Sequence, residues 1–108
     1  MIQQAYSPSS SAEFLLAARL LSRGAFAAVG KTVLLLRRMP YMGRRQGPGP
    51  GERPLARGCR CLFVPRTNYV IYYHISGKRR MITLVLLGDT REDPERQQRA
   101  LRRASNNL

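Results

Sequence analysis

The stretch from Gly58 to Gly88 constrains the fold of this chain more than any other part of the sequence. Its β-branched and aromatic residues gather in three segments, which predict strands at residues 58–64, 69–76 and 81–87. Both connections are short and contain turn-forming residues, proline and asparagine in the first and Gly77 in the second. Because such short connections join antiparallel strands, the sequence predicts an antiparallel meander.

The alternation of side chains predicts how these strands are buried. The third strand is apolar on both faces, which is typical of a central, covered strand. Its alternation assigns one face to Ile82, Leu84 and Leu86 and the other to Met81, Val85 and Leu87. In the second strand, Ile71, Tyr73 and Ile75 share the more apolar face, and Val70, Tyr72 and His74 share the other. The apolar face of the sheet therefore needs a cover from the N-terminal half.

Two predicted helices supply this cover. Ser10 and Glu13 match a capping box at the start of a helix over residues 11–23, and Gly24 is placed to end it. An apolar stripe at helical spacing indicates a second helix over residues 25–38, formed by Phe26, Val29, Val33 and Leu36. Residues ahead of Ser7 predict a first edge strand. We therefore expect an α+β fold, in which an N-terminal edge strand and a helical hairpin pack on a three- to four-stranded antiparallel meander sheet.

A chain of 108 residues is expected to form one domain. We assign residues 1–93 to this domain and residues 94–108 to a basic C-terminal helix or tail. In the predicted helix from Glu95 to Ala104, Leu101 is the single large apolar residue. Such a polar helix is solvated or disordered on its own, or it docks on a partner.

The charge balance indicates a polyanionic partner. The chain carries 19 Lys and Arg residues against 6 Asp and Glu residues, a formal net charge of +13. This excess favours nucleic acid, a nucleic-acid machine or an acidic protein as the partner, and a generally solvated basic surface is the alternative. The arginines that flank or enter the first meander strand form the candidate binding surface: Arg44, Arg45, Arg57, Arg60 and Arg66. Exposed aromatics, namely Tyr41 and Tyr72, are expected to add contact area to it.

Other kinds of site are not indicated. Arg19, Arg23 and Lys31 interrupt the apolar helical region, so no run approaches the about 20 apolar residues that a membrane span needs. Cys59 and Cys61 share one face of a strand without a neighbouring histidine, and we interpret them as buried reduced thiols rather than a zinc site. No metal and no cofactor is expected.

The sequence allows two interpretations for each of two segments, the loop at residues 43–54 and the N-terminal region. The Gly- and Pro-rich residues 43–54 predict a loop that lacks the Gly-Lys-Ser/Thr ending of a phosphate-binding loop. It is either an arginine-bearing loop near a binding surface or a solvated linker. The Arg-rich, acid-poor N-terminal region has the composition of a mitochondrial transit peptide, but its removal would leave the sheet uncovered.

Four short motifs occur in a characteristic order along the chain. They are Tyr6-Ser7-Pro8 before the first helix, Pro40-Tyr41-Met42-Gly43-Arg44 after the second, Tyr69-Val70-Ile71-Tyr72-Tyr73 in the second strand, and Leu87-Gly88-Asp89-Thr90-Arg91 at the end of the last strand. With the order of one strand, two helices, a basic loop and three strands, the chain resembles the RelE/ParE superfamily of toxins from type II toxin–antitoxin modules. The resemblance covers residues 1–93.

The resemblance implies one of two activities. RelE-like members enter the ribosomal A site and cut mRNA without a metal, using basic residues and a tyrosine or similar group. ParE-like members block DNA gyrase by binding it. Both kinds are neutralised by an antitoxin whose C-terminal segment wraps the toxin. The resemblance thus implies a cognate acidic antitoxin, DNA gyrase or the ribosome with its mRNA as the target, no membrane partner and a bacterial cytoplasmic location.

The residues favour the ParE-like interpretation. RelE-like nucleases carry a catalytic arginine after the first tyrosine of the second sheet strand, where this chain has Val70. They also carry a tyrosine past the last strand, whereas no Tyr or His lies between Gly88 and Leu108. Arg91 matches the family's arginine after the last strand; it belongs to the predicted binding surface, and it is catalytic if the chain is RelE-like. We predict a gyrase-inhibiting toxin without catalysis, with a RelE-like endoribonuclease and a non-toxic nucleic-acid-binding domain as alternatives.

Overall fold

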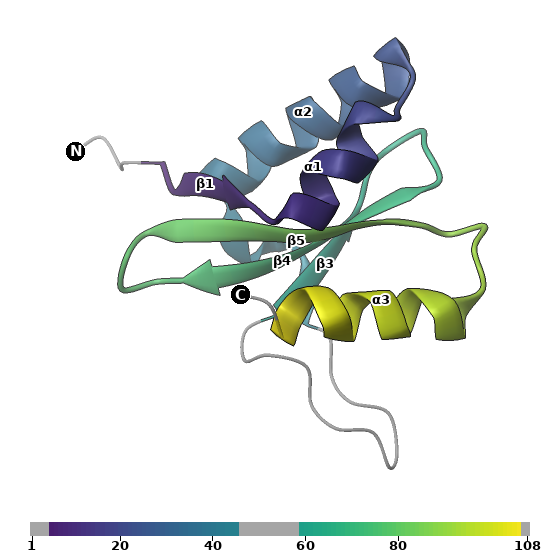
Figure 1. Cartoon of the computed structure of the whole chain (residues 1–108). Coiled ribbons are helices and arrows are strands. Elements are labelled where there is room, and N and C mark those ends of the chain that lie inside the picture. Colours follow the sequence, from purple (N-terminus) through teal and green to yellow (C-terminus); the bar gives the residue numbers. More distant parts are fainter. Residues whose placement is uncertain (1–4, 46–58, 107–108) are drawn as a thin grey trace.

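A five-stranded mixed sheet forms the centre of the molecule (Figure 1). The computed structural model describes residues 5–45 and 59–106. The strand order is β1-β5-β4-β3-β2; β1 pairs with β5 in parallel and every other pair is antiparallel. The elements are β1 (Ser7–Ser10), α1 (Ala12–Arg19), α2 (Arg23–Arg38), the 3-10 helix η1 (Pro40–Met42), β2 (Arg44–Arg45), β3 (Cys59–Phe63), β4 (Tyr69–Ser76), β5 (Met81–Asp89) and α3 (Pro94–Asn106).

The predicted α+β class and the antiparallel meander of β3, β4 and β5 are confirmed. The sheet has the predicted N-terminal edge strand, β1, and four antiparallel strands, because the short β2 extends the meander at the opposite edge. The first strand also lies later than predicted, at Ser7–Ser10 instead of ahead of Ser7. Its parallel pairing with β5 joins segments far apart in sequence, so no local pattern of side chains could reveal it.

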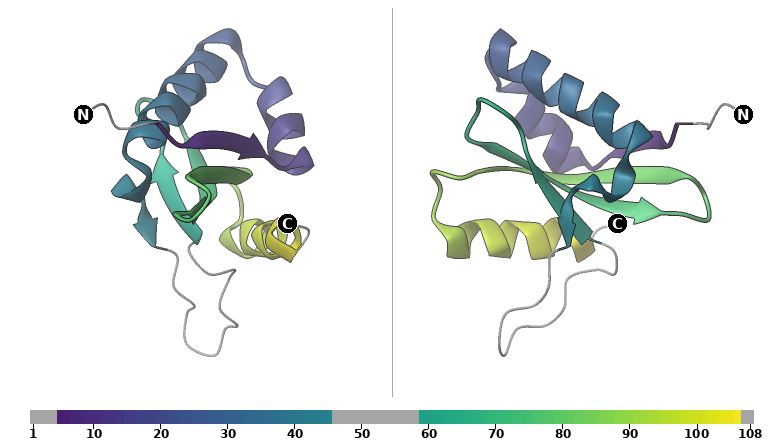
Figure 2. Two further views of the ribbon diagram at one scale, coloured as in Figure 1. Left: turned by 90° about the vertical axis from the view of Figure 1, so that its left-hand side faces the viewer. Right: turned by 180° about the vertical axis from the view of Figure 1, so that it is seen from behind.

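Helices cover both faces of the sheet (Figure 2). Helices α1 and α2 lie on one face and α3 lies on the other. The larger core lies under α1 and α2, where Phe14, Val29 and Leu36 meet Ile71, Tyr73, Ile82 and Leu84. The smaller core lies under α3, where Leu101 and Ala104 meet Cys59, Cys61, Val70, Tyr72 and Val85. The predicted cover from the N-terminal half and the predicted burial of both cysteines are thus confirmed.

A β-bulge changes the predicted faces of β5. Tyr72 pairs with Leu86 and Tyr73 pairs with Leu84, so Val85 is the extra residue. Beyond the bulge the alternation is reversed. Leu87 therefore joins the core under α1 and α2, and Leu86 packs against the core under α3. The prediction that grouped Leu86 with Leu84 was wrong for this reason.

The helix boundaries are set by serine caps. The Ser11 side chain accepts a hydrogen bond from the Phe14 amide at 3.0 Å and caps α1, so the predicted Ser10 cap was wrong. The Ser22 side chain accepts from the Ala25 amide at 3.2 Å and caps α2. Gly24 consequently lies in the first turn of α2 and does not end α1.

Helix α3 docks on its own sheet. Leu101 is fully buried, and the Gln97 amide Nε2 donates a hydrogen bond to the Tyr72 hydroxyl at 2.9 Å. A Cβ at Gly88 would collide with the Gln97 side chain, so the absence of a side chain at Gly88 permits this close approach. The predicted alternatives for this segment, a solvated or disordered helix or one docked on a partner, were therefore wrong, because α3 packs within the molecule.

No helix in the described residues combines the length and the hydropathy needed to cross a membrane.

Candidate functional site

An open groove of about 970 Å³ lies between α2 and the β3–β4 connection. Its apolar surface comes from Ala25, Ala28 and Leu35 of α2 and from Leu62 and Phe63 of β3. Helix α2 offers small side chains here, so the strand side chains remain accessible from the outside. The groove is therefore a place where an apolar side chain from another molecule can be received.

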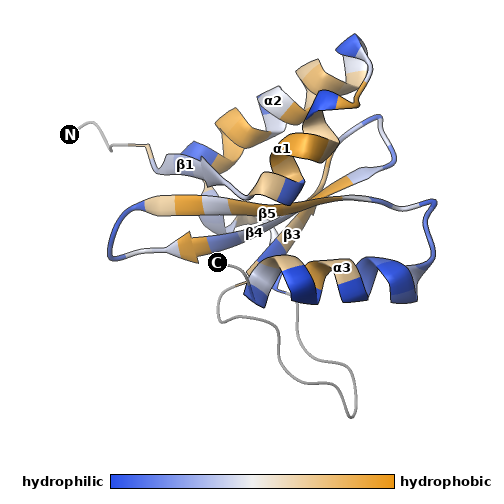
Figure 3. Ribbon diagram, in the orientation of Figure 1, coloured by the Kyte–Doolittle hydropathy of each residue, from blue (hydrophilic) through white to orange (hydrophobic). Residues whose placement is uncertain are grey.

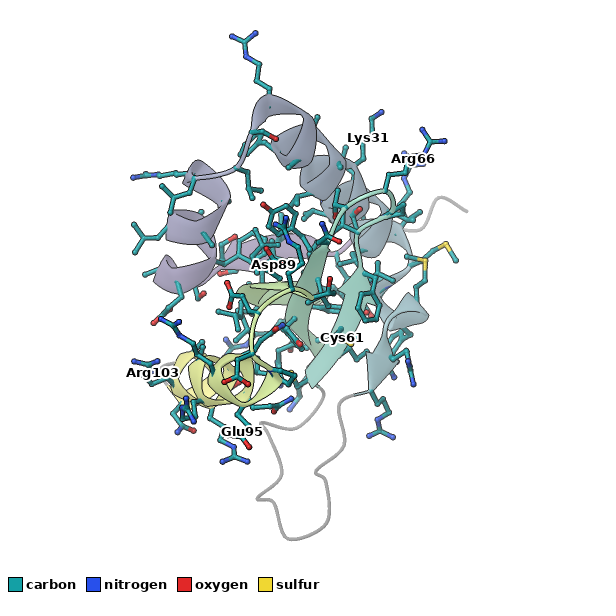
Figure 4. The ribbon with its side chains drawn as sticks, turned by 90° about the vertical axis from the view of Figure 1, so that its right-hand side faces the viewer. Lys31, Cys61, Arg66, Asp89, Glu95 and Arg103 are labelled. Carbon is teal, nitrogen blue, oxygen red and sulfur yellow. The ribbon has the colours of Figure 1, made fainter. Side chains whose placement is uncertain are left out.

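Three basic side chains stand around this groove: Lys31 from α2, Arg66 from the β3–β4 connection and Arg91 after β5. None of the groove's described lining residues is acidic. Figure 4 shows Lys31 and Arg66 projecting on the same side of the molecule, away from α3. Arg66 has a positive φ of 64°, because it lies in the tight connection between two antiparallel strands. An apolar floor with a cationic rim is suited to a partner that carries both apolar and acidic side chains.

Arg91 is held by its neighbour Asp89. Its Nη2 lies 2.7 Å from Asp89 Oδ2, and its Nε donates to Asp89 Oδ1 at 3.0 Å. The hydrogen bond from the Arg91 side chain lowers the pKa of Asp89, and the same bond raises the pKa of Arg91. Arg91 therefore enters the groove as half of an ion pair. These bonds use Nε and Nη2, so the carboxylate offsets part of the charge that Arg91 presents to a phosphate.

The other predicted arginines lie elsewhere. Arg44 and Arg45 form the exposed edge strand β2, and Arg45 lies opposite Arg60 of β3. The Arg60 Nη1 donates to the Gly43 carbonyl at 2.7 Å and to the Tyr41 carbonyl at 3.2 Å. Arg57 falls outside the described residues. The structure thus divides the predicted surface: Arg66 and Arg91 belong to the groove, and Arg44, Arg45 and Arg60 form a separate edge.

Tyr72 is not an exposed aromatic. Only 8% of its surface is accessible, because it lies under α3 and its hydroxyl is bonded to Gln97. Burial is the main cause that raises its pKa. Val70 lies under the same helix, and His74 is half-buried opposite Cys59. The expectation that Tyr72 would be exposed was wrong, since the alternation could give its face but not the helix that covers it. Tyr41, in contrast, is 58% exposed.

The sequence analysis missed a surface of exposed apolar side chains on α1 and α2. It is formed by Leu15, Leu16, Leu20, Phe26, Leu34 and Leu35. Leu20, at the end of α1, has 88% of its surface accessible. The prediction that Phe26 lies on the core stripe was wrong, because 57% of its surface is exposed; the other five residues were not assigned to that stripe. Lys31, which lines the groove, was not selected as a binding residue, because the sequence analysis considered it only as a charge that interrupts the apolar helical region.

In the part of the chain that the structure describes, no group of three or more His, Cys, Asp or Glu side chains is placed to hold a metal ion. The one ion pair between described residues joins Arg91 to Asp89. The described site therefore offers apolar contact and positive charge.

No protein-family model and no curated protein sequence matches the chain. Its fold is similar to that of the isolated E. coli RelE toxin, with a TM-score of 0.67 and 13% identity over 91% of this chain and 98% of that chain. It is also similar to a chain of the intact E. coli RelBE toxin–antitoxin complex, with a TM-score of 0.66 and 14% identity over 82% and 100%. For an E. coli RelE mutant in the free state, the TM-score is 0.70 and the identity 16% over 92% and 97%.

These likenesses extend over nearly the whole of each RelE chain, and they concern the fold, because the sequences differ at most positions. The RelE/ParE-like fold that the sequence resemblance predicted is confirmed.

Proposed function

We propose that this chain is the toxin of a type II toxin–antitoxin module and that it acts in the ParE-like manner, by binding DNA gyrase. In this proposal an acidic antitoxin neutralises the toxin by covering the groove and the apolar surface of α1 and α2. The protein acts in the bacterial cytoplasm, where its target is found.

One observation carries the proposal: large apolar side chains remain exposed on α1 and α2, beside a groove rimmed by cations. Exposing Leu16, Leu20 and Phe26 to water is unfavourable by roughly 25 cal/mol for each Å² that a partner would cover. An amphipathic helix covers such a surface by placing its apolar residues in the groove. Acidic residues on that helix would meet Lys31 and Arg66, which gives charge complementarity as well as apolar contact.

The surroundings of the nuclease positions support a toxin that acts by binding. Val70 and Tyr72 are buried under α3, and the Arg91 guanidinium is paired with Asp89. A general acid–base group must come within hydrogen-bond reach of the proton that it transfers. Tyr72 can do so only after α3 has moved away.

The net charge of +13 is compatible with gyrase as the target. A strongly basic protein is drawn to DNA and to acidic surfaces by long-range electrostatic attraction, which raises the association rate at low ionic strength. This attraction would bring the toxin to a machine that is already bound to DNA.

The deciding experiment measures plasmid supercoiling by purified gyrase with added protein, in parallel with mRNA cleavage on translating ribosomes. The expected result is loss of supercoiling with intact mRNA. Cut mRNA with unaffected gyrase would contradict the proposal and support the RelE-like alternative. In that case Arg91 and Arg66 would be the first residues to replace in search of the chemistry.

A charge-reversal pair tests the groove. Arg66→Glu is expected to weaken binding of the cognate antitoxin by at least tenfold, because it places a carboxylate where acidic side chains should dock. Arg99→Glu makes the same change on the exposed surface of α3 and should leave the affinity within about twofold. Isothermal titration calorimetry measures both values. Equal losses in the two variants would show that overall charge, not the groove, determines binding.

A further inference from the structure

Three segments that are distant in sequence meet at one corner of the molecule. They are the residue before β1, the helix η1 and the β4–β5 turn at residues 77–80. The Ser7 amide donates to the Arg80 carbonyl at 2.9 Å, which ties the start of β1 to the end of this turn. A Cβ built on Gly77 would lie 3.4 Å from the Tyr41 hydroxyl, so the turn and η1 are also in contact range. We name the residues at this place the tyrosine corner: Tyr6, Tyr41, Arg60 and Arg80.

Two aromatic rings and two guanidinium groups are paired at the tyrosine corner. The Arg60 guanidinium lies 5.2 Å from the centre of the Tyr41 ring, and that of Arg80 lies 5.7 Å from the centre of the Tyr6 ring. The side chains of Tyr6 and Tyr41 are close enough for Tyr41 to raise the pKa of Tyr6. Both distances are within the range of cation–π attraction. The corner is therefore a continuous arrangement of rings and cations.

The arginines of the corner are held in position by the backbone. Arg60 donates from Nη1 to the carbonyls of Gly43 and Tyr41, so its guanidinium is fixed beside η1. Arg80 has a positive φ of 51°, which directs the chain through the tight turn into β5. Because Arg60 uses one nitrogen for these bonds, its remaining N–H groups can bind an anion.

The corner is open to solvent. Tyr41 and Arg80 are exposed, and Tyr6 and Arg60 are half-buried. Burial is the main cause that raises the pKa of Tyr6, and the neighbouring Tyr41 acts in the same direction. The Tyr6 phenol is therefore neutral at physiological pH, and it adds no negative charge that would repel an anion.

Charge is segregated around this corner. Additional cations lie in the same turn and on neighbouring elements: Lys78 and Arg79 in the β4–β5 turn, Arg37 at the end of α2 and Arg45 on β2. The carboxylates of the described residues lie elsewhere: Glu13 in the first turn of α1, Asp89 at the far end of β5, and Glu92, Asp93 and Glu95 around the start of α3. Figure 1 shows this separation, with the β4–β5 turn at the left end of the sheet and the β5–α3 connection at the right.

We propose that the tyrosine corner is a binding site for single-stranded nucleic acid, RNA or DNA. An unpaired base stacks on the exposed Tyr41 ring, and the phosphodiester chain runs along the cations on either side. Exposed aromatic rings between cations are what single-strand binding requires, because each base offers a flat face and each nucleotide carries a negative charge.

The nature of the ligand follows from the aromatic rings. Duplex nucleic acid keeps its bases stacked on one another, so it could use the cations but not the rings. An acidic polypeptide likewise could use only the cations. The groove lies beside Tyr69 at the start of β4, whereas the corner lies beyond Ser76 at the end of β4. This inference therefore does not depend on the proposed toxin function.

The test is fluorescence anisotropy of labelled twelve-nucleotide U and dT strands with the full chain. We expect both to bind, with affinity falling about sevenfold between 50 and 200 mM salt if two phosphates are contacted. Tyr41→Ala should weaken binding about tenfold through loss of stacking, and Tyr41→Phe, which keeps the ring, should restore it. Stronger binding of the U strand identifies RNA as the natural ligand, and stronger binding of the dT strand identifies DNA.

Matched arginine variants localise the site. Arg80→Asn should reduce the slope of log affinity against log salt by about 0.7, since one phosphate contact is lost. Asparagine is chosen because it tolerates a positive φ. Arg99→Asn removes the same charge from the exposed surface of α3 and should leave the slope unchanged.

Four results would overturn the proposal. They are an absence of binding to both strands, full affinity in a folded Tyr41→Ala variant, equal binding of a duplex of the same length, and equal competition by polyglutamate of matched charge. Circular dichroism melting of each variant establishes that it is folded before its affinity is compared.

Discussion

The two helical layers of this molecule bury their sheet faces in different ways. Helices α1 and α2 cover the larger core and still present Leu16, Leu20 and Leu34 to solvent. Helix α3 covers the smaller core with little more than Leu101 and Ala104, and its remaining surface is polar and basic. Figure 3 shows the contrast, since apolar colouring runs along α1 and α2 whereas α3 is mostly blue.

The difference indicates which helical layer has exposed apolar surface that a partner could cover. A helix that is apolar beyond its core stripe is either covered by another molecule or prone to self-association. Helix α3 has its apolar residues inside and its charges outside, so its packing is complete within the chain. If the proposed toxin function holds, the antitoxin should therefore bind the layer of α1 and α2, and the buried face of α3 has a structural role.

The largest expected effect comes from Leu101→Ala. Leu101 is fully buried and is the main apolar anchor of α3, so the substitution should lower the free energy of unfolding by about 3 kcal/mol. Leu36→Ala, at an equally buried position of α2, should cost a similar amount. Urea unfolding followed by circular dichroism measures both values. If Leu101→Ala lowered the free energy of unfolding by less than 1 kcal/mol while Leu36→Ala had the expected effect, α3 would contribute little to stability. Its packing within the chain would then not be complete.

Substitutions of two adjacent tyrosines, Tyr72 and Tyr73, should have an intermediate effect on stability. Because the two side chains lie on opposite faces of the sheet, they allow a direct comparison of the two layers. Tyr73 donates to the Pro40 carbonyl at 2.8 Å and accepts from the Gly43 amide at 2.9 Å, on the α2 side. Tyr73→Phe leaves both buried backbone groups without this partner and should cost about 2 kcal/mol. Tyr72→Phe leaves only the Gln97 amide without a partner and should cost about 1 kcal/mol.

A second substitution separates these two cases. Replacing Gln97 by Leu in the Tyr72→Phe background removes the remaining polar partner and should recover most of the lost stability in urea unfolding. No side-chain change can do this for Tyr73, because its partners are backbone atoms. Equal recovery of Tyr73→Phe by Gln97→Leu would show that the two sheet faces are coupled.

Local patterns in the sequence predicted the meander and the two N-terminal helices, because these depend on neighbouring residues. They could not predict that α3 docks on the sheet, since its contacts use Gln97, Ala104 and the absence of a side chain at Gly88. The bulge at Val85 was equally invisible, because it arises from pairing with β4.

The candidate sites were harder to predict than the fold. Arg66 and Arg91 are predicted binding residues that line the groove, but the groove also includes Lys31, whose neighbours come from a distant strand connection. The tyrosine corner joins Tyr6, Tyr41 and Arg80 from three separate segments. Sequence spacing does not predict that these three segments are neighbours, because only the folded sheet brings them together.

The smallest effect on stability, and the sharpest test of the comparison between the layers, is expected for Leu20→Ser. Leu20 is almost fully exposed, so the substitution should change the free energy of unfolding by less than about 0.5 kcal/mol. It should nevertheless reduce concentration-dependent self-association in sedimentation velocity and weaken binding of the proposed antitoxin, because apolar surface is removed from the α1 and α2 layer. The same change at Leu101 should instead unfold much of the protein, since it places a hydroxyl in the core under α3. If Leu20→Ser destabilised the isolated chain by more than 1 kcal/mol, Leu20 would have to be covered within the molecule, and the layer of α1 and α2 would be as complete as that of α3.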